Sequence, residues 1–271
     1  MLVDTHTHFY DEWLLPDAEA AIQRALDAGV GKMIQADVDS LERPRMWEIG
    51  LRHPGVLFQM LGLYPGSVTA DNWKEELDAV YRIAAGDSLA SLGMTGTTPG
   101  MAGIVAIGEI GLDYHEGKEF AREQKEVLRL QFELAAKLNL PVNIHLRDAW
   151  EDFFSVLEDC RHLHLRGNLH CFSGSFEVYE RANRSGDFAV GIGGVLTFKN
   201  ASLPAVVARI PAEHLLLETD APYLAPVPYR GKRNESAYLP LVAARLAEVK
   251  GLSLKEIETI TTDNAIRLFN L

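Results

Sequence analysis

Histidine and carboxylate residues follow short apolar segments at several places in this sequence. His6 and His8 come after the first such segment, and on an extended chain two residues with this spacing point to the same side. Four more side chains of this kind follow later apolar segments: Glu109, His145, His170 and Asp220. Imidazoles and carboxylates together bind Zn²⁺, Mn²⁺ or Mg²⁺, and the share of histidine favours the transition metals. Since such ions activate water, the pattern predicts a metal-dependent hydrolytic centre.

The segments that must position these residues alternate between two patterns. Eight apolar runs predict β-strands, and segments with helical periodicity lie between most of them. We predict strands at residues 1–3, 33–36, 56–61, 104–107, 142–144, 167–169, 188–190 and 215–217. We predict helices at residues 18–28, 41–51, 73–84, 119–138, 151–157, 203–210, 238–250 and 253–268. This order indicates one α/β domain over residues 1–271, a (β/α)8 TIM-type barrel, regular or distorted, with extra C-terminal helices.

In such a barrel the carboxyl ends of the strands meet at one mouth, so the six candidate ligands would surround a common point. A lone buried histidine is more often a hydrogen-bonded core residue, but six such groups at one register are hard to explain in that way. One catalytic ion commonly takes about three protein ligands, so this set suits two divalent ions bridged by a carboxylate. Glu109 is the expected bridge. His6, His8 and Asp220 are assigned to one ion, and His145 and His170 to the other.

Composition narrows the class of protein. The 271 residues are 47% hydrophobic and 24% charged, which is typical of a soluble globular protein. The formal net charge of −12 disfavours a general nucleic-acid coat protein, because the whole molecule repels polyanions. Two cysteines are too few for a disulfide framework and indicate a reducing compartment. Neither an export signal nor a run of about 18 apolar residues is visible, so we expect a cytoplasmic protein without a membrane span.

The motifs around the candidate ligands closely resemble those of the TatD family of metal-dependent deoxyribonucleases. They are DTHTH at 4–8, GEIGLDY at 108–114, HLR at 145–147, HCFSG at 170–174, ETDAPYLAP at 218–226 and RGKRNE at 230–235. The resemblance runs in order along the chain to NAIRLF at 264–269. It implies a TIM-barrel hydrolase with divalent metal ions and 3′ to 5′ exonuclease activity on DNA, sometimes on RNA. The metal ligands of the family fall on the same six residues.

Two departures from the family pattern concern the rim of the site. Where the family usually has Gly-hydrophobic-His-Pro-His, this chain has GLYPG at 62–66, so Tyr64 and Gly66 replace both histidines. The segment 86–103 is longer than is usual in the family and rich in Gly, Ser and Thr, which is typical of an inserted loop. Its role, as a lid, an oligomer contact or neither, stays open.

Further residues are assigned roles toward substrate. Asp220 and Glu109 are the expected catalytic carboxylates, and Asp220 would orient a water molecule and accept its proton. A structural Asp220 that caps the following turn is the alternative. The expected phosphate contacts, which ordinary solvated charges or a simple turn would also explain, are Arg147, Ser173, Arg230 and Lys232. The aromatic residues Tyr114, Phe172 and Tyr223 either stack on a terminal base or pack in the barrel.

The expected function is hydrolysis of phosphodiester bonds in nucleic acid, at single-stranded ends, by a monomeric enzyme. The same centre would also suit hydrolysis of a small ester, lactone, amide or phosphotriester, or of an aminoacyl-tRNA ester. A metal-binding scaffold without activity is a third reading, which six intact candidate ligands disfavour. Related two-metal hydrolases often bridge their ions with a carboxylated lysine, and Glu109 at that position favours the TatD-like reading.

Overall fold

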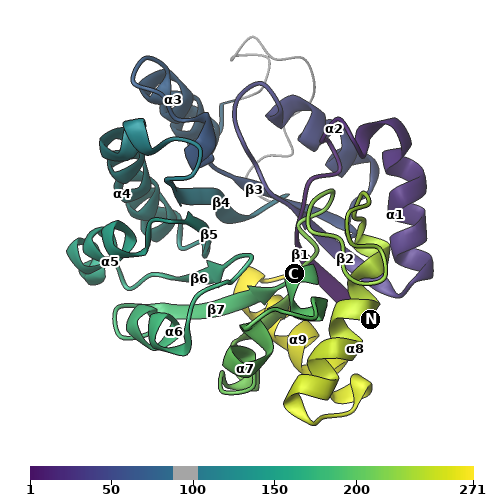
Figure 1. The fold of residues 1–271 in the computed structure, drawn as a ribbon. Coiled ribbons are helices and arrows are strands. Elements are labelled where there is room, and N and C mark those ends of the chain that lie inside the picture. Colours follow the sequence, from purple (N-terminus) through teal and green to yellow (C-terminus); the bar gives the residue numbers. More distant parts are fainter. Residues whose placement is uncertain (88–102) are drawn as a thin grey trace.

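The computed structural model describes residues 1–87 and 103–271. Eight parallel strands form one sheet in which neighbours follow sequence order, and the helices surround it (Figure 1). A bridge between Thr7 and Ala221 joins the last strand region to the first, so the sheet is a nearly closed barrel. The strands are β1 (Leu2–Thr7), β2 (Val30–Gln35), β3 (Leu57–Leu61), β4 (Ile104–Asp113), β5 (Val142–Arg147), β6 (Arg166–Leu169), β7 (Asp187–Ile192) and β8 (Leu215–Leu217). The predicted (β/α)8 barrel is confirmed.

Most helices connect successive strands, and two follow β8 as expected. They are α1 (Ala18–Asp27), α2 (Arg43–Arg52), α3 (Trp73–Ala84), α4 (Ala121–Leu138), α5 (Trp150–Asp159), α6 (Phe176–Ala182), α7 (Leu203–Val207), α8 (Leu239–Lys250) and α9 (Leu254–Phe269). Short 3-10 helices are η1 (Leu15–Asp17), η2 (Pro65–Ser67), η5 (Lys118–Phe120), η6 (Arg161–Leu163), η7 (Gly194–Thr197), η8 (Ala212–His214) and η9 (Ser236–Tyr238). None of the helices in the described ranges has both the length and the apolar character needed to cross a membrane.

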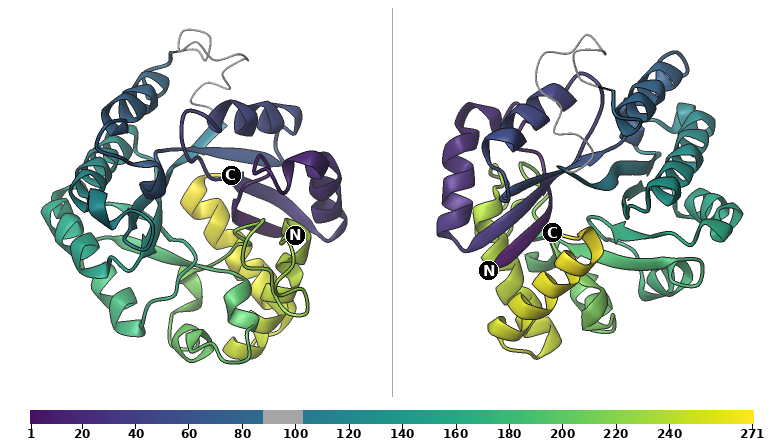
Figure 2. Two further views of the ribbon diagram at one scale, coloured as in Figure 1. Left: turned by 45° about the horizontal axis from the view of Figure 1, so that its top comes forward. Right: turned by 180° about the vertical axis from the view of Figure 1, so that it is seen from behind.

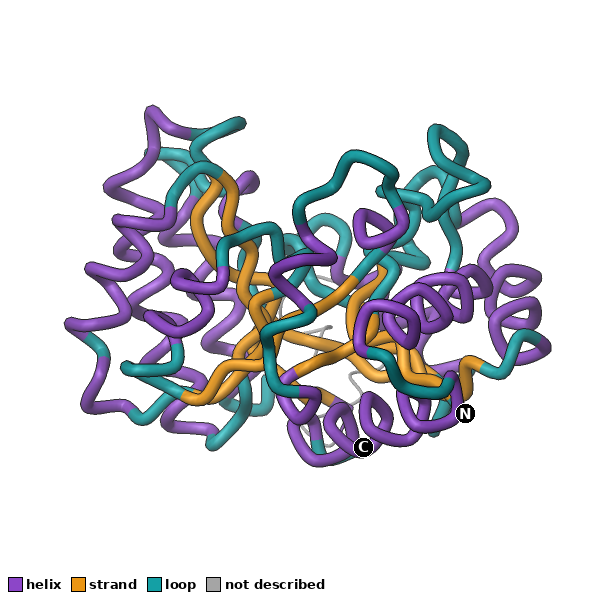
Figure 3. Tube along the Cα trace, turned by 60° about the horizontal axis from the view of Figure 1, so that its bottom comes forward, coloured by secondary structure: helices purple, strands orange, loops and turns teal. Residues whose placement is uncertain are grey.

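The amino-terminal end of the barrel is closed by α9. Phe269 and Ala265 of this helix are buried together with apolar side chains of several strands: Val3, Ile34, Met60, Ala106 and Leu216. Asn264 donates hydrogen bonds of 2.9 Å to the carbonyls of Ala212 and Leu215, at the start of β8. Figure 2 shows α9 crossing one end of the barrel, and Figure 3 shows it beneath the strands. Because apolar groups fill this end, the polar residues gather at the other.

The observed elements differ from the predicted ones mainly at their carboxyl ends. β1, β4 and β5 continue past the predicted residues 3, 107 and 144, because the polar residues that follow remain in the sheet. Glu109 therefore lies inside β4 rather than after it, and His145 pairs with Gly111 of β4. The predicted helix at 203–210 ends at Val207. The inserted segment 86–103 falls almost wholly at residues 88–102, outside the described residues.

The sequence patterns did not indicate α6, which has only seven residues. So short a helix completes barely two turns and shows little periodicity. Its start is nevertheless defined by Ser175, whose hydroxyl accepts the backbone N–H of Val178 at 3.3 Å.

A fully buried ion pair ties the carboxyl ends of β2 and β3 to the backbone of β4. Arg43 Nε lies 2.6 Å from Asp37 Oδ2, and its Nη2 donates to the carbonyl of Gly62 at 3.0 Å. The backbone of Asp37 accepts the N–H of Glu109 at 3.0 Å. Burial raises the pKa of Asp37 to about 6 in spite of the charge and hydrogen bond of Arg43. The pair thus fixes the backbone that carries Glu109.

We expect Arg43→Ala to lower the free energy of unfolding by about 3–5 kcal/mol at pH 8, because it leaves the Asp37 carboxylate buried without a counter-charge. Chemical denaturation measures the change. The matched control is Arg45→Ala on the same helix, whose exposed pair with Glu42 is worth about 1 kcal/mol or less. Equal losses of unfolding free energy in the two variants would show that the buried pair stabilises the protein no more than the exposed pair does.

Candidate metal centre

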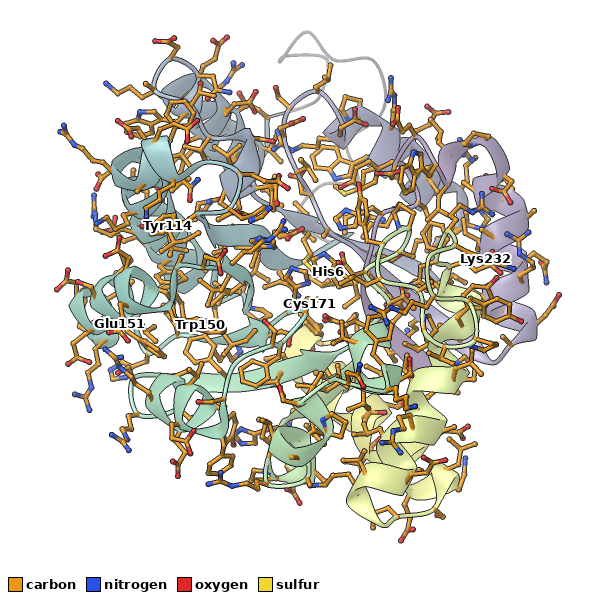
Figure 4. The ribbon with its side chains drawn as sticks, viewed as in Figure 1. His6, Tyr114, Trp150, Glu151, Cys171 and Lys232 are labelled. Carbon is orange, nitrogen blue, oxygen red and sulfur yellow. The ribbon has the colours of Figure 1, made fainter. Side chains whose placement is uncertain are left out.

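The structure brings together all six residues that the sequence singled out. His6 lies on β1 and His8 directly after it, Glu109 on β4 and His145 on β5. His170 and Asp220 come directly after β6 and soon after β8. Figure 4 shows His6 near the centre of the barrel, with Cys171, the neighbour of His170, close by. Strand ends that are far apart in sequence therefore build one site.

The two carboxylate oxygens of Glu109 face different partners. Oε1 lies 2.9 Å from His145 Nδ1 and 3.0 Å from His170 Nε2. Oε2 lies 3.2 Å from His6 Nε2 and 3.8 Å from His8 Nε2. Glu109 thus stands between two groups of nitrogen atoms, one on each of its oxygens.

Asp220 completes the group on the Oε2 side. Its Oδ1 lies 3.5 Å from His8 Nε2 and 3.7 Å from His6 Nε2, and those two nitrogens are 3.1 Å apart. His6, His8 and Asp220 offer ligand atoms that all lie within 4.8 Å of one another, and so do His6, Glu109 and His170. Both sets could hold a cation.

A second layer of side chains lies against the other nitrogen of each imidazole, within hydrogen-bond distance for His6, His8 and His145 and farther away for His170. Nδ1 of His6 lies 2.9 Å from Asn143 Oδ1, and Nδ1 of His8 lies 2.9 Å from the hydroxyl of Tyr10. Nε2 of His145 lies 2.8 Å from Asp113 Oδ2, while His170 Nδ1 lies 3.6 Å from Glu218 Oε1. Contacts of this kind set the tautomer and orientation of metal-binding histidines. The four nitrogens that face Glu109 and Asp220 are therefore the ones left for a cation.

The charges of the cluster also fit cations. Burial raises the pKa of the Glu109 carboxyl, but the charges of His170 and His6 and the hydrogen bonds from His145 and His170 hold it well below its usual range. For His170, burial acts to lower the pKa, but Glu109 and then Glu218 raise it well above its usual value. The His170 imidazole thus retains a proton as a counter-charge to Glu109. A divalent cation competes with such a proton for the same nitrogen, so the donor set fits a metal centre.

Side-chain exposure locates the opening of the site. Glu109 is 4% exposed and His6 is fully buried, whereas Asp220 is 15% and His145 17% exposed. The centre is therefore open to solvent on the side of Asp220 and His145.

The backbone after β8 is arranged to present Asp220. Asp220 has a positive φ of 55°, and its N–H donates to the carbonyl of His6 at 2.9 Å. The preceding Thr219 donates its N–H and hydroxyl to the buried carboxylate of Asp4, at 2.9 and 2.6 Å. Asn234 donates to the carbonyl of Thr219 at 2.8 Å. This network places the carboxylate opposite His6 and His8.

The predicted phosphate contacts are more dispersed. Arg147 is exposed and forms a 3.2 Å ion pair with Glu116, and Ser173 is exposed next to the buried Phe172. Arg230 lies over the ring of Phe198, 4.3 Å from its centroid. Lys232 is exposed, and Figure 4 shows it toward the outside, near α1. Their role toward a substrate stays a prediction.

Tyr64 and Gly66 occupy the rim next to His145. The ring of Tyr64 stands edge-on to His145 at 5.0 Å between centroids, and its hydroxyl donates to Asp113 Oδ2 at 3.4 Å. A Cβ atom at residue 66 would lie 2.4 Å from Tyr64 Cε1, so glycine there leaves room for the ring. The two replacements are thus sterically coupled.

Comparison with known proteins agrees with this geometry. The sequence profile of the family described as TatD related DNase matches residues 3–270. The chain belongs to the TatD family. An uncharacterized metal-dependent hydrolase of Bacillus subtilis, YabD, is 38% identical over 272 residues and covers all of both chains. The 3′-5′ ssDNA/RNA exonuclease TatD of Erwinia tasmaniensis is 33% identical over 261 residues, 94% of each chain. The protein is therefore a metal-dependent hydrolase of the TatD type.

Solved structures give the same result. YJJV, a TatD homolog from Escherichia coli K12, superposes with a TM-score of 0.84 at 30% identity, covering 100% of this chain and 98% of the other. A TatD family hydrolase from Entamoeba histolytica has a TM-score of 0.83 at 22% identity, covering 99% and 97%, and shows the fold alone. The TatD barrel is thus retained in this chain.

Sequence reasoning missed the residues that orient the histidines. Asn143 alternates with His145 on β5, and this period of two was a usable signal that both face the barrel interior. Asp113 belongs to the recognised GEIGLDY motif but received no role. Glu218, which lies near His170, likewise begins the recognised ETDAPYLAP motif but received no role. Tyr10 carries no local signal, because only the fold brings it to His8.

We expect Asp113→Asn to weaken metal binding about 10- to 100-fold, because it removes the charge that orients His145. Hydrogen bonds and the charge of His145 lower the pKa of Asp113 to about 2 against the effect of burial, so the carboxylate is ionised at neutral pH. Titration against a competing chelator gives the affinity. The control is Asp152→Asn, an acid bonded to Tyr114 and Lys125 outside the centre. A wild-type affinity for Asp113→Asn would contradict this role.

Proposed function

We propose that this TatD-family protein is a phosphodiesterase that removes nucleotides from the 3′ end of single-stranded nucleic acid. The observation that carries the proposal is the position of Glu109, whose two oxygens face two separate groups of nitrogens. The relatives named as 3′-5′ ssDNA/RNA exonucleases, about 32% identical to this chain, support the choice of substrate. The expected centre contains two divalent ions.

Glu109 would bridge the ions, with His6, His8 and Asp220 on one side and His145 and His170 on the other. When bound, such ions acidify water and neutralise charge on the non-bridging phosphate oxygens. Zn²⁺, Mn²⁺ and Mg²⁺ are all compatible with this donor set, in which four imidazoles favour the first two.

Asp220 is the acid that would accept a proton. Burial raises the pKa of its carboxyl, but the hydrogen bond to His8 and the charges of His170 and His6 lower it below its usual value. It is therefore ionised at neutral pH, and unlike Glu109 its side chain reaches the opening. His6 and His8 hold its Oδ1, which leaves the other oxygen to orient water.

The proposed contacts for the substrate phosphates are Arg147, Ser173, Arg230 and Lys232. Arg230 and Lys232 form no ion pair within residues 1–87 and 103–271, so their charges are available to an anion. Arg147 shares its charge with the exposed Glu116 and can exchange that partner for a phosphate. Ser173 lies three residues after His170, where its backbone N–H would face the same substrate phosphate.

Chelation tests the proposal as a whole. We expect the protein to release mononucleotides from a 5′-labelled single-stranded oligonucleotide, to lose this activity after metal removal, and to regain it on addition of Mn²⁺, Zn²⁺ or Mg²⁺. Gel analysis of the labelled products follows the reaction. An oligonucleotide blocked by a 3′-phosphate is the control for the end preference. Hydrolysis of small esters or lactones without any cleavage of oligonucleotides would overturn the proposal and favour the small-molecule alternative.

Asp220→Asn tests the assignment of the proton acceptor. We expect kcat to fall at least about 100-fold while KM changes little, because the amide cannot take a proton but keeps the size of the side chain. Steady-state kinetics on the same oligonucleotide measure both constants, and metal content is determined in parallel. A rise in KM that accounts for the whole loss would instead make Asp220 a substrate-binding residue.

A further inference from the structure

Two large aromatic side chains lie exposed beside the candidate metal centre. Trp13 is 57% exposed and Tyr223 is 46% exposed. Their ring centroids are 6.2 Å apart, with 48° between the planes. Single exposed apolar residues are common, but here Leu224 and Val227 are also exposed on the same loop, at 41% and 46%. An exposed aromatic pair with further exposed apolar residues on one of its loops is typical of a binding surface.

This aromatic pair is joined directly to the metal centre. The ring of Tyr223 stands edge-on to His8, 6.3 Å between centroids. The N–H of Tyr223 donates to the carbonyl of Asp220 at 2.8 Å, so the ring belongs to the same turn as that carboxylate. Its hydroxyl donates to Asp11 Oδ2 at 2.7 Å, on the segment that leads from His8 to Trp13. A molecule bound at the centre therefore reaches these rings.

The backbone beneath both rings is held in place. Arg233 donates to the carbonyl of Trp13 at 2.9 Å, and Asn234 donates to the carbonyl of Tyr223 at 2.7 Å. Arg233 is paired with Asp17, and Arg24 with Glu235 and Asp17. The ion pairs under the rings thus balance in charge, and Asp11 adds one negative charge beside Tyr223. What the two rings offer to a ligand is their aromatic faces.

We propose that Trp13 and Tyr223 form a platform on which the base of the 3′-terminal nucleotide stacks. The inference rests on the proposed nuclease function and adds the subsite that holds the base. Aromatic faces accept every base, which suits an enzyme that removes successive nucleotides without reading sequence. Of the other aromatic candidates, Phe172 is buried and Tyr114 is half-buried and packed against the barrel core. Of the three aromatic residues that the sequence singled out for stacking on a base, only Tyr223 remains a candidate. The structure adds Trp13.

The platform predicts a base-dependent and salt-independent contribution to binding. We expect Trp13→Ala in the metal-loaded protein to weaken the binding of 2′-deoxyadenosine 5′-monophosphate about 5- to 150-fold, the range of one stacked base. Binding of 2-deoxyribose 5-phosphate, which has the phosphate but lacks the base, should not change. Calorimetric titration at two salt concentrations gives both affinities, and the fold-change should be the same at each. Phosphate contacts, in contrast, weaken with salt.

Two further variants complete the design. Trp13→Phe keeps an aromatic face and should retain most of the affinity for the nucleotide. Leu254→Ala removes an apolar side chain of similar exposure, 43%, at the first residue of α9 and should leave both ligands unaffected. Circular dichroism verifies that each variant is folded. Equal weakening of both ligands by Trp13→Ala, or no weakening of either, would overturn the platform.

An oligonucleotide assay separates this inference from the proposed function. Oligonucleotides that end in a normal or an abasic 3′ residue are compared, and Trp13→Ala should slow cleavage of the normal end only. If wild-type protein cleaves both and Trp13→Ala treats them like wild type, the platform fails while the nuclease function stands. If wild-type protein cleaves neither but binds the mononucleotide through Trp13, the nuclease function fails while the platform stands.

Discussion

The structure depends on one buried carboxylate with a different group of imidazoles on each oxygen. Glu109 is 4% exposed, so its negative charge is costly unless positive charge surrounds it. His145 and His170 approach one oxygen, and His6 approaches the other. A side chain in this position requires cations or protons on both sides. The rest of the barrel must therefore hold four imidazoles, from separate strand regions, around this one acid.

The barrel meets these demands by separating apolar and polar ends. At the amino end α9 covers the strands, and Phe269 is buried among their apolar side chains. At the carboxyl end, polar residues remain within the strands and are fixed by buried partners. Arg43 and Asp37 hold the backbone of Glu109, and Asp4 holds Thr219 next to Asp220. The rigid scaffold carries the histidines, while exposed aromatic and cationic residues are left to the loops of the rim.

The sequence predicted the barrel and the convergence of the six side chains, because each follows an apolar run and all such runs end at one mouth. It could not predict the buried pair of Arg43 and Asp37, since charged residues on a helix and in a loop normally indicate exposure. Nor could it find the contact of Tyr10 with His8, which depends on how the chain turns after β1. Trp13 was missed for the opposite reason: an isolated tryptophan in a loop is usually read as core, and only the structure shows its exposure.

The contact between Tyr64 and residue 66 limits how this rim can diverge. A ring at 64 that rests against His145 fills the volume into which any side chain at 66 would project. An exchange of Gly66 is therefore tolerated only after, or together with, an exchange or displacement of Tyr64. The histidine-bearing and tyrosine-bearing forms of this rim are discrete alternatives, and a single amino-acid replacement does not interconvert them.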